Sequence, residues 1–373
     1  MTRPKVLLFF EYGTLNGGEF SLLAMLKVLE QTTFEFVAAV PVEGLLAKRL
    51  ARCDIAVLPL ALRDAQGHKR PIEAINTHLI EIVSHVRPNL VHANSLSMGR
   101  MLGRIASQLT IPCTSHLRDI IKLNKTAMAD LNNNSGLIAV SHATRQFHVA
   151  QGMVVDKVSV IYNGVDTEMF SPAQSDGTLR RELGLGNSAV LLANIGQICL
   201  RKGQTVLAHA FVALASAYPR LNMLFVGERH SQKAESIAYE KEIQHIFRQG
   251  GVEDRLFCLG FRNDIPAILN ETDMLVHAAH QEPLGRVLLE AASVGQAIVA
   301  TDVGGTAEIL TNDVSALLVA PNDVHALAVA IRQLVTDEAL SKRLGHQARI
   351  GATEMFSISA ATTKVGRFWE SFL

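Results

Sequence analysis

The sequence predicts an α/β protein with two doubly wound domains, each a parallel sheet with helices on both faces. Short continuous apolar runs alternate with longer helical patterns along the whole chain, which is typical of buried parallel strands. The chain has 373 residues, more than a single hydrophobic core usually serves. Its 48% hydrophobic residues exclude a disordered or collagen-like chain.

Thirteen strands are expected where aliphatic and β-branched residues run together. They are residues 5–10, 34–40, 55–60, 90–93, 113–116, 137–140 and 158–162, then 190–195, 223–226, 256–259, 274–278, 298–300 and 317–319. Helices are expected between them, for example at residues 18–29 and 72–86, where apolar residues recur every three or four positions.

The domain boundary is expected in residues 166–187, where turn-forming residues gather. This divides the chain into an amino-terminal domain, residues 1–170, and a carboxyl-terminal domain, residues 185–355. The final segment, residues 358–373, has the pattern of a helix with an aromatic face that must be buried.

Composition excludes several classes of protein. The chain has 35 basic and 35 acidic residues, whereas a dedicated nucleic-acid binder would carry a basic surplus. No apolar run approaches the roughly 18 residues of a membrane span, and residues 1–13 are not expected to form a signal peptide. Four scattered cysteines, at positions 53, 113, 199 and 258, predict buried thiols in a reducing cytosol.

Residues 100–125 are locally basic, with five bases and one acid. A solvated helix face would explain this. A weak site for anionic lipid or for an acidic acceptor is the alternative.

The most informative motif is EPLGRVLLE at residues 282–290, directly after an expected strand. Pro283 predicts the start of a helix, and Gly285 lets a ligand approach the backbone. The amides of the first helical turn could then bind anionic or hydroxyl oxygens.

Glu282 and Glu290 would lie about 12 Å apart if the whole segment were helical. This is too far for the acid and nucleophile of a glycosidase. The spacing instead predicts two contacts on one extended ligand. The alternative for Glu290 is a surface ion pair with Arg286, four residues earlier.

With its neighbours, this motif resembles glycosyltransferase family 4, the group 1 glycosyltransferases, which are retaining sugar-nucleotide-dependent enzymes. The resemblance covers about residues 13–310, in the family's order. It is carried by Glu282 and Glu290 in an E-x7-E pattern and by residues 291–295, 301–308, 196–203, 161–166, 140–144 and 17–19. It implies the GT-B fold, in which two Rossmann-like domains face a cleft, the carboxyl-terminal domain holds the donor nucleotide, and the last helix, residues 356–373, packs back on the amino-terminal domain.

The resemblance also implies how the donor is held. Glu282 and the backbone amides of Leu284, Gly285 and Arg286 would face the donor sugar, and Glu290 would face the ribose.

Lys202 would neutralise charge on the departing diphosphate, the main electrostatic demand of this chemistry. A solvated lysine near a helix start is its alternative. Gln197 is a departure, since similar enzymes have an arginine there, and glutamine keeps a donor but loses the charge. Arg201, Arg286 or Arg118 could compensate.

Two loops complete the expected donor site. Gly17 and Gly18 open a helix after the first strand and could cradle phosphate; an ordinary tight turn is the alternative. Backbone groups of Phe261 and Arg262 are placed near the nucleobase by the resemblance. Asp264 could instead, or also, cap the following helix.

His116 ends the fifth strand, where related enzymes place a histidine or acid facing the donor sugar. Arg118, Asp119 and His92 are the candidate acceptor-side residues. The chain has 14 histidines, so most of them are ordinary surface or core residues.

No metal-binding motif is present, so a metal-independent hexosyltransferase without cofactors is expected. Its donor would be a UDP- or GDP-sugar, and its acceptor a hydroxyl of a saccharide or lipid-linked molecule in cell-surface, exopolysaccharide or lipopolysaccharide synthesis. It would act in the cytoplasm, with the inner membrane face and weak peripheral association as an option. A sugar-nucleotide epimerase or hydrolase of the same fold, and a non-catalytic sugar-nucleotide-binding subunit, remain alternatives.

Overall fold

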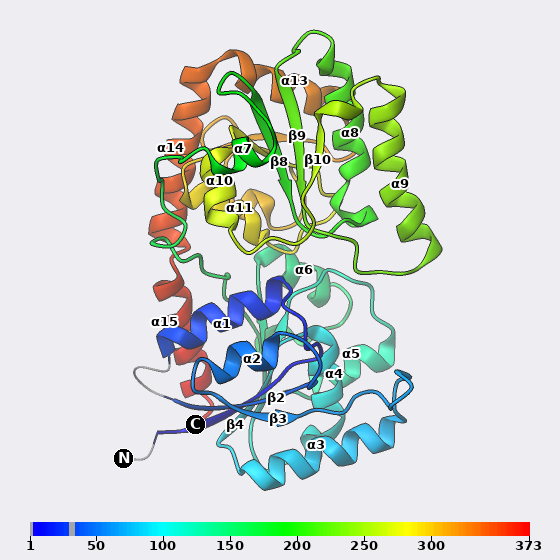
Figure 1. Cartoon of the computed structure of the whole chain (residues 1–373). Helices are drawn as coiled ribbons and strands as arrows, with labels where there is room; N and C mark the ends of the chain where they lie inside the picture. Colours follow the sequence, from blue (N-terminus) through cyan, green and yellow to red (C-terminus); the bar gives the residue numbers. More distant parts are fainter. Residues whose placement is uncertain (1–2, 30–33) are drawn as a thin grey trace. The chain divides into compact units, whose positions relative to one another are not determined.

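The computed structural model describes residues 3–29 and 34–373, and its internal contacts divide the chain into two compact units (Figure 1). The amino-terminal unit comprises Met1–Gly164 and Ile358–Leu373, and the carboxyl-terminal unit comprises Val165–Ser357. Each unit is built around a parallel sheet.

The amino-terminal sheet has seven parallel strands in the order β3-β2-β1-β4-β5-β6-β7. The strands are β1 (Lys5–Phe9), β2 (Glu35–Val40), β3 (Ala56–Pro59), β4 (Leu90–Ala93), β5 (Cys113–Leu117), β6 (Gly136–Ala139) and β7 (Val158–Val160). The helices of this unit are α1 (Gly17–Leu29), α2 (Leu46–Ala51), α3 (Ile72–Val86), α4 (Leu96–Ile105), α5 (Lys125–Asn132), α6 (His142–Val149) and α15 (Ile358–Glu370), with 3₁₀ turns η1 (Ala106–Gln108) and η2 (Val155–Lys157).

Both faces of this sheet are buried, which explains the unbroken apolar strands. On β1, Val6 and Leu8 pack into one hydrophobic cluster, whereas Leu7 and Phe9 pack into another. Because successive side chains of a strand point to opposite faces, each face needs its own apolar residues.

The carboxyl-terminal sheet has six parallel strands in the order β10-β9-β8-β11-β12-β13. The strands are β8 (Val190–Ile195), β9 (Leu221–Val226), β10 (Leu256–Cys258), β11 (Met274–His277), β12 (Ala297–Thr301) and β13 (Leu317–Val319). The helices are α7 (Thr178–Glu182), α8 (Gln204–Ala215), α9 (Ala234–Gln249), α10 (Ile265–Glu271), α11 (Arg286–Ser293), α12 (Thr306–Ile309), α13 (Val324–Thr336) and α14 (Glu338–Met355), with 3₁₀ turns η3 (Leu200–Lys202) and η4 (Glu253–Arg255).

All thirteen expected strands are present, each within two residues of its predicted bounds at either end. The division between the units differs from the expected one, since it falls after Gly164 rather than at 170–185. The turn-rich segment 166–187 packs on the carboxyl-terminal unit, where the Asn270 side chain bonds to the Ser171 carbonyl at 3.1 Å and the Ala173 amide at 2.8 Å.

The last helix, α15, belongs to the amino-terminal unit, where the resemblance placed it. Val365 and Trp369 are fully buried there. The Trp369 ring meets Phe34 edge-on, with ring centroids 5.7 Å apart. The aromatic face expected from the sequence is therefore part of this unit's core.

The prediction of four buried thiols is wrong in part. Cys113 is buried, but Cys53 and Cys199 are only partly buried and Cys258 is exposed. Cys258 lies on β10, a short strand at the edge of its sheet, where one neighbouring strand is missing.

No helix within residues 3–29 and 34–373 is long and apolar enough to cross a membrane.

Each sheet has a point at which the strand order reverses direction. These switch points lie between β1 and β4 in the first sheet and between β8 and β11 in the second. Ligands of such sheets bind outside the carboxyl ends of the strands at the switch point. A ligand site is therefore expected in the loops that follow these four strands.

Candidate functional site

The switch point of the carboxyl-terminal sheet brings Lys202 and Glu282 together. Lys202 ends the loop that follows β8, and Glu282 lies in the loop that follows β11. The Lys202 Nζ donates to the Glu282 Oε2 at 2.5 Å, and only 13% and 8% of the two side chains are exposed. Two residues 80 positions apart thus form one largely buried ion pair where a ligand of this fold is expected.

The Glu282 carboxylate has further partners. The His277 Nε2 lies 2.7 Å from the same Oε2, and an Arg201 Nη1 lies 4.0 Å away. Burial alone would raise the pKa of Glu282, but Lys202, His277 and Arg201 together hold the pKa well below its usual range. Glu282 is therefore an ionised carboxylate at neutral pH.

His277 was missed by the sequence analysis. It is the last residue of β11, fully enclosed, and burial followed by the charge of Lys202 lowers its pKa. The neutral ring therefore donates its Nε2 proton to Glu282. A histidine at a strand end, five residues before a predicted site carboxylate, was the available signal.

Gly203 allows the two loops to approach. Its φ is +63°, and a Cβ there would lie 2.0 Å from the carbonyl oxygen of Ala278. Any other residue would be strained by its backbone angle and would push the loop after β11 away.

The helix after Glu282 begins later than predicted. Pro283 does not start it; α11 begins at Arg286, after Gly285 with a φ of +104°. The left-handed Gly285 interrupts the helical path, so Glu282 lies on the loop before the helix. Leu284 and Gly285, whose amides were predicted to face the sugar, belong to that loop.

Arg286 and Glu290 form the ion pair that was the alternative to a ribose contact, with 2.7 Å between Nη1 and Oε1. It is not a surface pair, because only 4% of the Glu290 side chain is exposed. Burial raises the pKa of Glu290, and Arg286 opposes this. The predicted contact of Glu290 with a ribose stays a prediction.

The remaining predicted donor residues of the carboxyl-terminal unit follow the carboxyl ends of β8 and β10. The backbone carbonyl of Gln197, in the loop after β8, accepts a bond from Gln204 at 3.0 Å. Of the three arginines that could replace the charge missing at Gln197, Arg201 is the one that the structure places against Glu282.

Phe261 and Arg262 follow β10, and 41% of Phe261 is exposed. Arg262 pairs with Asp264 at 2.6 Å and with Glu182 at 2.7 Å. The prediction that the Asp264 side chain caps α10 is wrong, since it makes no capping bond there and binds Arg262 instead.

In the amino-terminal unit, Gly17 and Gly18 begin α1 after the loop that follows β1. A Cβ on Gly18 would lie 2.8 Å from the Cδ of Arg118, so the arginine stem lies against the helix start. The Arg118 guanidinium donates to the side chains of Asn94 at 2.9 Å and Asn163 at 2.7 Å. Burial lowers the pKa of Arg118 to about 10, which leaves it charged at neutral pH.

His116 and His92 lie side by side on β5 and β4, with the His92 Nε2 2.7 Å from the His116 Nδ1. Only 1% of His116 and none of His92 is exposed. Asp119 is exposed, and its carbonyl is 2.8 Å from the His148 Nε2. The structure therefore brings His116 and His92 together, with Arg118 two residues beyond His116.

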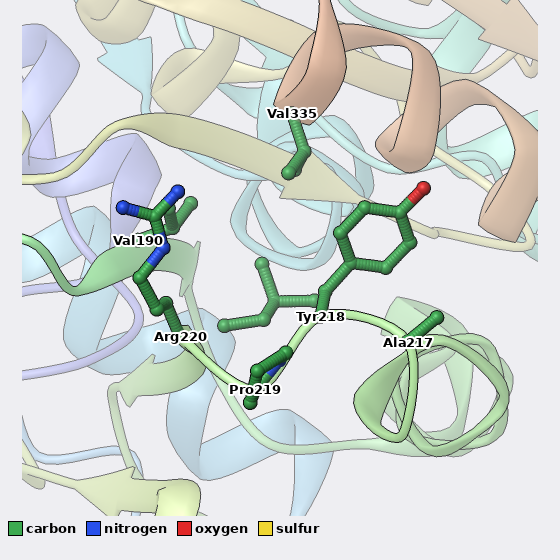
Figure 2. A pocket seen from close by; sticks show the side chains of 7 residues that line it. Val190, Ala217, Tyr218, Pro219, Arg220 and Val335 are labelled. Atoms are coloured by element: carbon green, nitrogen blue, oxygen red, sulfur yellow. The ribbon is translucent and has the colours of Figure 1, made fainter.

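Other candidate features lie elsewhere. Within the described residues no group of three or more His, Cys, Asp or Glu side chains is arranged to hold a metal ion. A surface pocket lined by Tyr218, Pro219, Arg220 and Val335 lies near the amino ends of β8 and β9 (Figure 2). It contains none of the predicted site residues, and it lies at the opposite end of these strands from the Lys202–Glu282 pair.

Comparison with known proteins identifies the family and agrees with this fold. The model of the glycosyl transferases group 1 matches residues 176–350, and that of glycosyltransferase family 4 matches residues 15–169. Among solved structures, HepE of Anabaena in complex with UDP-glucose superposes with a TM-score of 0.88 at 23% identity, covering 99% of this chain and 100% of that one. The sucrose-phosphate synthase of Thermosynechococcus elongatus superposes with a TM-score of 0.82 at 18% identity, covering 99% of each chain.

Among curated relatives, a UDP-Gal:α-D-GlcNAc-diphosphoundecaprenol α-1,3-galactosyltransferase of Escherichia coli is 25% identical over 70% of each chain. An α-maltose-1-phosphate synthase of Mycobacterium tuberculosis is 30% identical over 60% of this chain and 59% of the relative. The matched region spans 70% of the E. coli protein, but only 51–61% of the three relatives that follow it in similarity.

The two parallel α/β units and these structural neighbours define a GT-B fold with two Rossmann-like domains. With the two family models covering residues 15–169 and 176–350, the chain belongs to the group 1 glycosyltransferases of family 4.

Proposed function

We propose that this chain transfers a sugar from a UDP-sugar to a hydroxyl group of a saccharide or lipid-linked acceptor in cell-surface, exopolysaccharide or lipopolysaccharide synthesis. The observation that carries the proposal is the buried Lys202–Glu282 pair at the β8/β11 switch point. Support for UDP comes from the E. coli relative, named for UDP-Gal, and from HepE structures with UDP and UDP-glucose. A GDP-sugar is the alternative donor.

In this proposal Lys202 stabilises the departing diphosphate. Lys202 and Arg201 carry two positive charges against the single negative charge of Glu282, and His277 is neutral. The cluster therefore keeps a net charge of +1. A fixed cation in a water-poor site stabilises the developing charge of a leaving group far more than it would in bulk water.

Glu282 has two roles in this proposal. It holds Lys202 in place before the donor arrives, and it accepts hydrogen bonds from the donor sugar hydroxyls. Only Oε2 is engaged by Lys202 and His277 in the bonds described above. Glu290 would bind the ribose, and the loop amides of Leu284, Gly285 and Arg286 would bind sugar oxygens.

Retention of configuration and independence from metal ions complete the proposal. The acceptor would attack from the same face as the leaving diphosphate, which itself helps to take the acceptor proton. Proton NMR of the product shows whether the anomeric configuration is kept. Turnover that persists in excess EDTA would support a metal-free mechanism, and loss of turnover restored by Mg²⁺ would contradict it.

His116 is the side chain of the amino-terminal unit that we propose acts in transfer. His116→Ala should reduce turnover more than it weakens binding of UDP. Equal loss of both would make His116 a structural residue.

A thermal-shift screen of UDP-, GDP- and ADP-sugars tests the donor directly, because a ligand that binds only the folded state raises the melting temperature. We expect the largest shift with a UDP-sugar. Larger shifts with GDP-sugars would correct the base, and no shift with any nucleotide would contradict the proposal.

Product analysis separates the alternatives. An altered sugar and free UDP at full rate without acceptor would indicate an epimerase or hydrolase. Tight donor binding without turnover on any extracted acceptor would indicate a binding subunit.

We also place the reaction in the cytoplasm, at the inner membrane face if the acceptor is lipid-linked. The basic segment 100–125 is the candidate contact with anionic lipid. Cell fractionation at low and high salt tests this, because an electrostatic attachment would be released by salt.

A further inference from the structure

Three aromatic side chains of the amino-terminal unit form a continuous hydrogen-bonded row. Trp369 comes from α15, His92 from β4 and His116 from β5. The Trp369 Nε1 donates to the His92 Nδ1 at 3.3 Å, and the His92 Nε2 lies 2.7 Å from the His116 Nδ1. Trp369 and His92 are fully buried and His116 is 1% exposed, so the row is shielded from water.

The chemistry of these groups fixes the direction of the bonds. An indole N–H is a donor only, so the His92 Nδ1 must accept. A neutral imidazole with an accepting Nδ1 carries its proton on Nε2 and donates it to the His116 Nδ1. His116, accepting at Nδ1, then carries its own proton on Nε2.

Thr114 is a second contact of the His92 Nδ1. Its Oγ1 lies 2.9 Å from the His92 Nδ1 and donates to the Val91 carbonyl oxygen at 3.3 Å. Because a hydroxyl has a single proton, Thr114 donates to an accepting His92 Nδ1 only when it gives up the longer bond to Val91. In the opposite tautomer, the His92 Nδ1 would donate to Thr114 and the indole N–H of Trp369 would face another N–H. A buried donor left without an acceptor costs about 1–3 kcal/mol.

Both rings are neutral at physiological pH. Burial, with a smaller effect of the Arg118 charge, lowers the pKa of His92 to about 3. Burial, Arg118 and then His92 lower the pKa of His116 well below its usual value. The row therefore determines which nitrogen of each neutral ring carries the proton, and not whether the ring is charged.

We propose that Trp369 and His92 are positioning residues that hold His116 in its Nε2–H tautomer. His116 then meets a ligand as a hydrogen-bond donor to a hydroxyl or phosphate oxygen, and not as a general base. This inference rests on the proposed function, because that proposal makes His116 part of the transfer site.

The tautomers can be read directly from the full-length protein labelled with ¹⁵N-histidine. Long-range ¹H–¹⁵N NMR spectra distinguish Nδ1–H, Nε2–H and doubly protonated rings, and His92→Gln and His116→Gln assign the two signals. We expect both histidines as neutral Nε2–H tautomers at pH 7. A His116 that carries its proton on Nδ1, or on both nitrogens, would overturn the inference. Because the spectrum needs no substrate, this outcome is separate from whether the chain turns over a UDP-sugar.

Trp369→Phe tests the role of the indole N–H, since it keeps a ring in the core but removes the donor. We expect His92 and His116 to become mixtures of tautomers and kcat with a UDP-sugar to fall about three- to tenfold, the usual worth of one hydrogen bond. The KM for the donor should stay within about twofold.

Phe372→Leu is the matched control, because Phe372 lies just after α15 and packs against the same core, where its ring meets Phe368. It should leave the tautomers and kcat unchanged. Wild-type tautomers in a folded Trp369→Phe variant, or equal effects of both variants, would overturn the inference.

Discussion

Replacing Lys202 with methionine removes the cation of the β8/β11 switch point and keeps most of the side-chain volume. If Lys202 stabilises the leaving diphosphate, kcat should fall by one to three decades, which corresponds to roughly 1.4–4 kcal/mol of transition-state stabilisation. The expected loss lies toward the lower end of this range, because Arg201, with its Nη1 4.0 Å from Glu282, remains as a second cation.

The same variant should be less stable, because Glu282 loses its nearest cation while its side chain stays only 8% exposed. Removing one partner of a buried ion pair costs about 3–5 kcal/mol, and Arg201 should again limit the loss to about 3 kcal/mol. Adding Glu282→Gln removes the unpaired charge as well. We therefore expect the double variant to regain stability but not turnover.

Release of UDP from a UDP-sugar measures the turnover, and urea denaturation measures the free energy of unfolding. The reasoning is refuted if Lys202→Met keeps kcat within about threefold of wild type. It is also refuted if the double variant regains turnover together with stability, because Lys202 would then act only by supporting the fold.

Three further outcomes are expected. Glu290→Gln should not lower stability at pH 7. Burial outweighs the Arg286 charge and raises the pKa of Glu290, so the fold favours the protonated carboxyl more than the unfolded chain does. This stabilising contribution is full below the unfolded pKa and is lost as pH rises through the folded pKa. Unfolding measured from pH 4 to 8 checks this, while donor affinity should fall if Glu290 binds the ribose. Gly203→Ala should destabilise the protein by about 1–3 kcal/mol, because the backbone there is left-handed and the new Cβ would collide with the Ala278 carbonyl. Gly186→Ala, with open space around it, is the control and should have little effect in the same denaturation assay. Arg262→Ala should change stability by no more than about 1 kcal/mol, since 41% and 48% of its partners Glu182 and Asp264 are exposed to solvent. Calorimetry should show nearly unchanged UDP affinity if the base is held by backbone groups.

The strands could be predicted from the sequence because both faces of each sheet are buried. A strand covered on both sides needs an unbroken apolar run, as in residues 5–9 and 190–195, and such runs are short enough to be distinguished from helices. The placement of Lys202 and Glu282 in one site could be anticipated as well, since both follow strands of one predicted sheet.

Other features depend on contacts that no local pattern encodes. Helix α11 starts at Arg286 because Gly285 has a left-handed backbone. The sequence predicted an earlier start because a proline stands at position 283. Asp264 could have capped α10, but Arg262 competes for its carboxylate. The bond between Trp369 and His92 joins residues 277 positions apart, and spacing in the sequence carries no information about it.

A crystal structure of the protein with bound UDP-sugar tests the central claim most directly. We predict that a diphosphate oxygen lies within hydrogen-bond distance of the Lys202 Nζ and that the sugar hydroxyls meet Glu282. A nucleotide bound away from the ends of β8 and β11, with the Lys202–Glu282 pair untouched, would contradict the account.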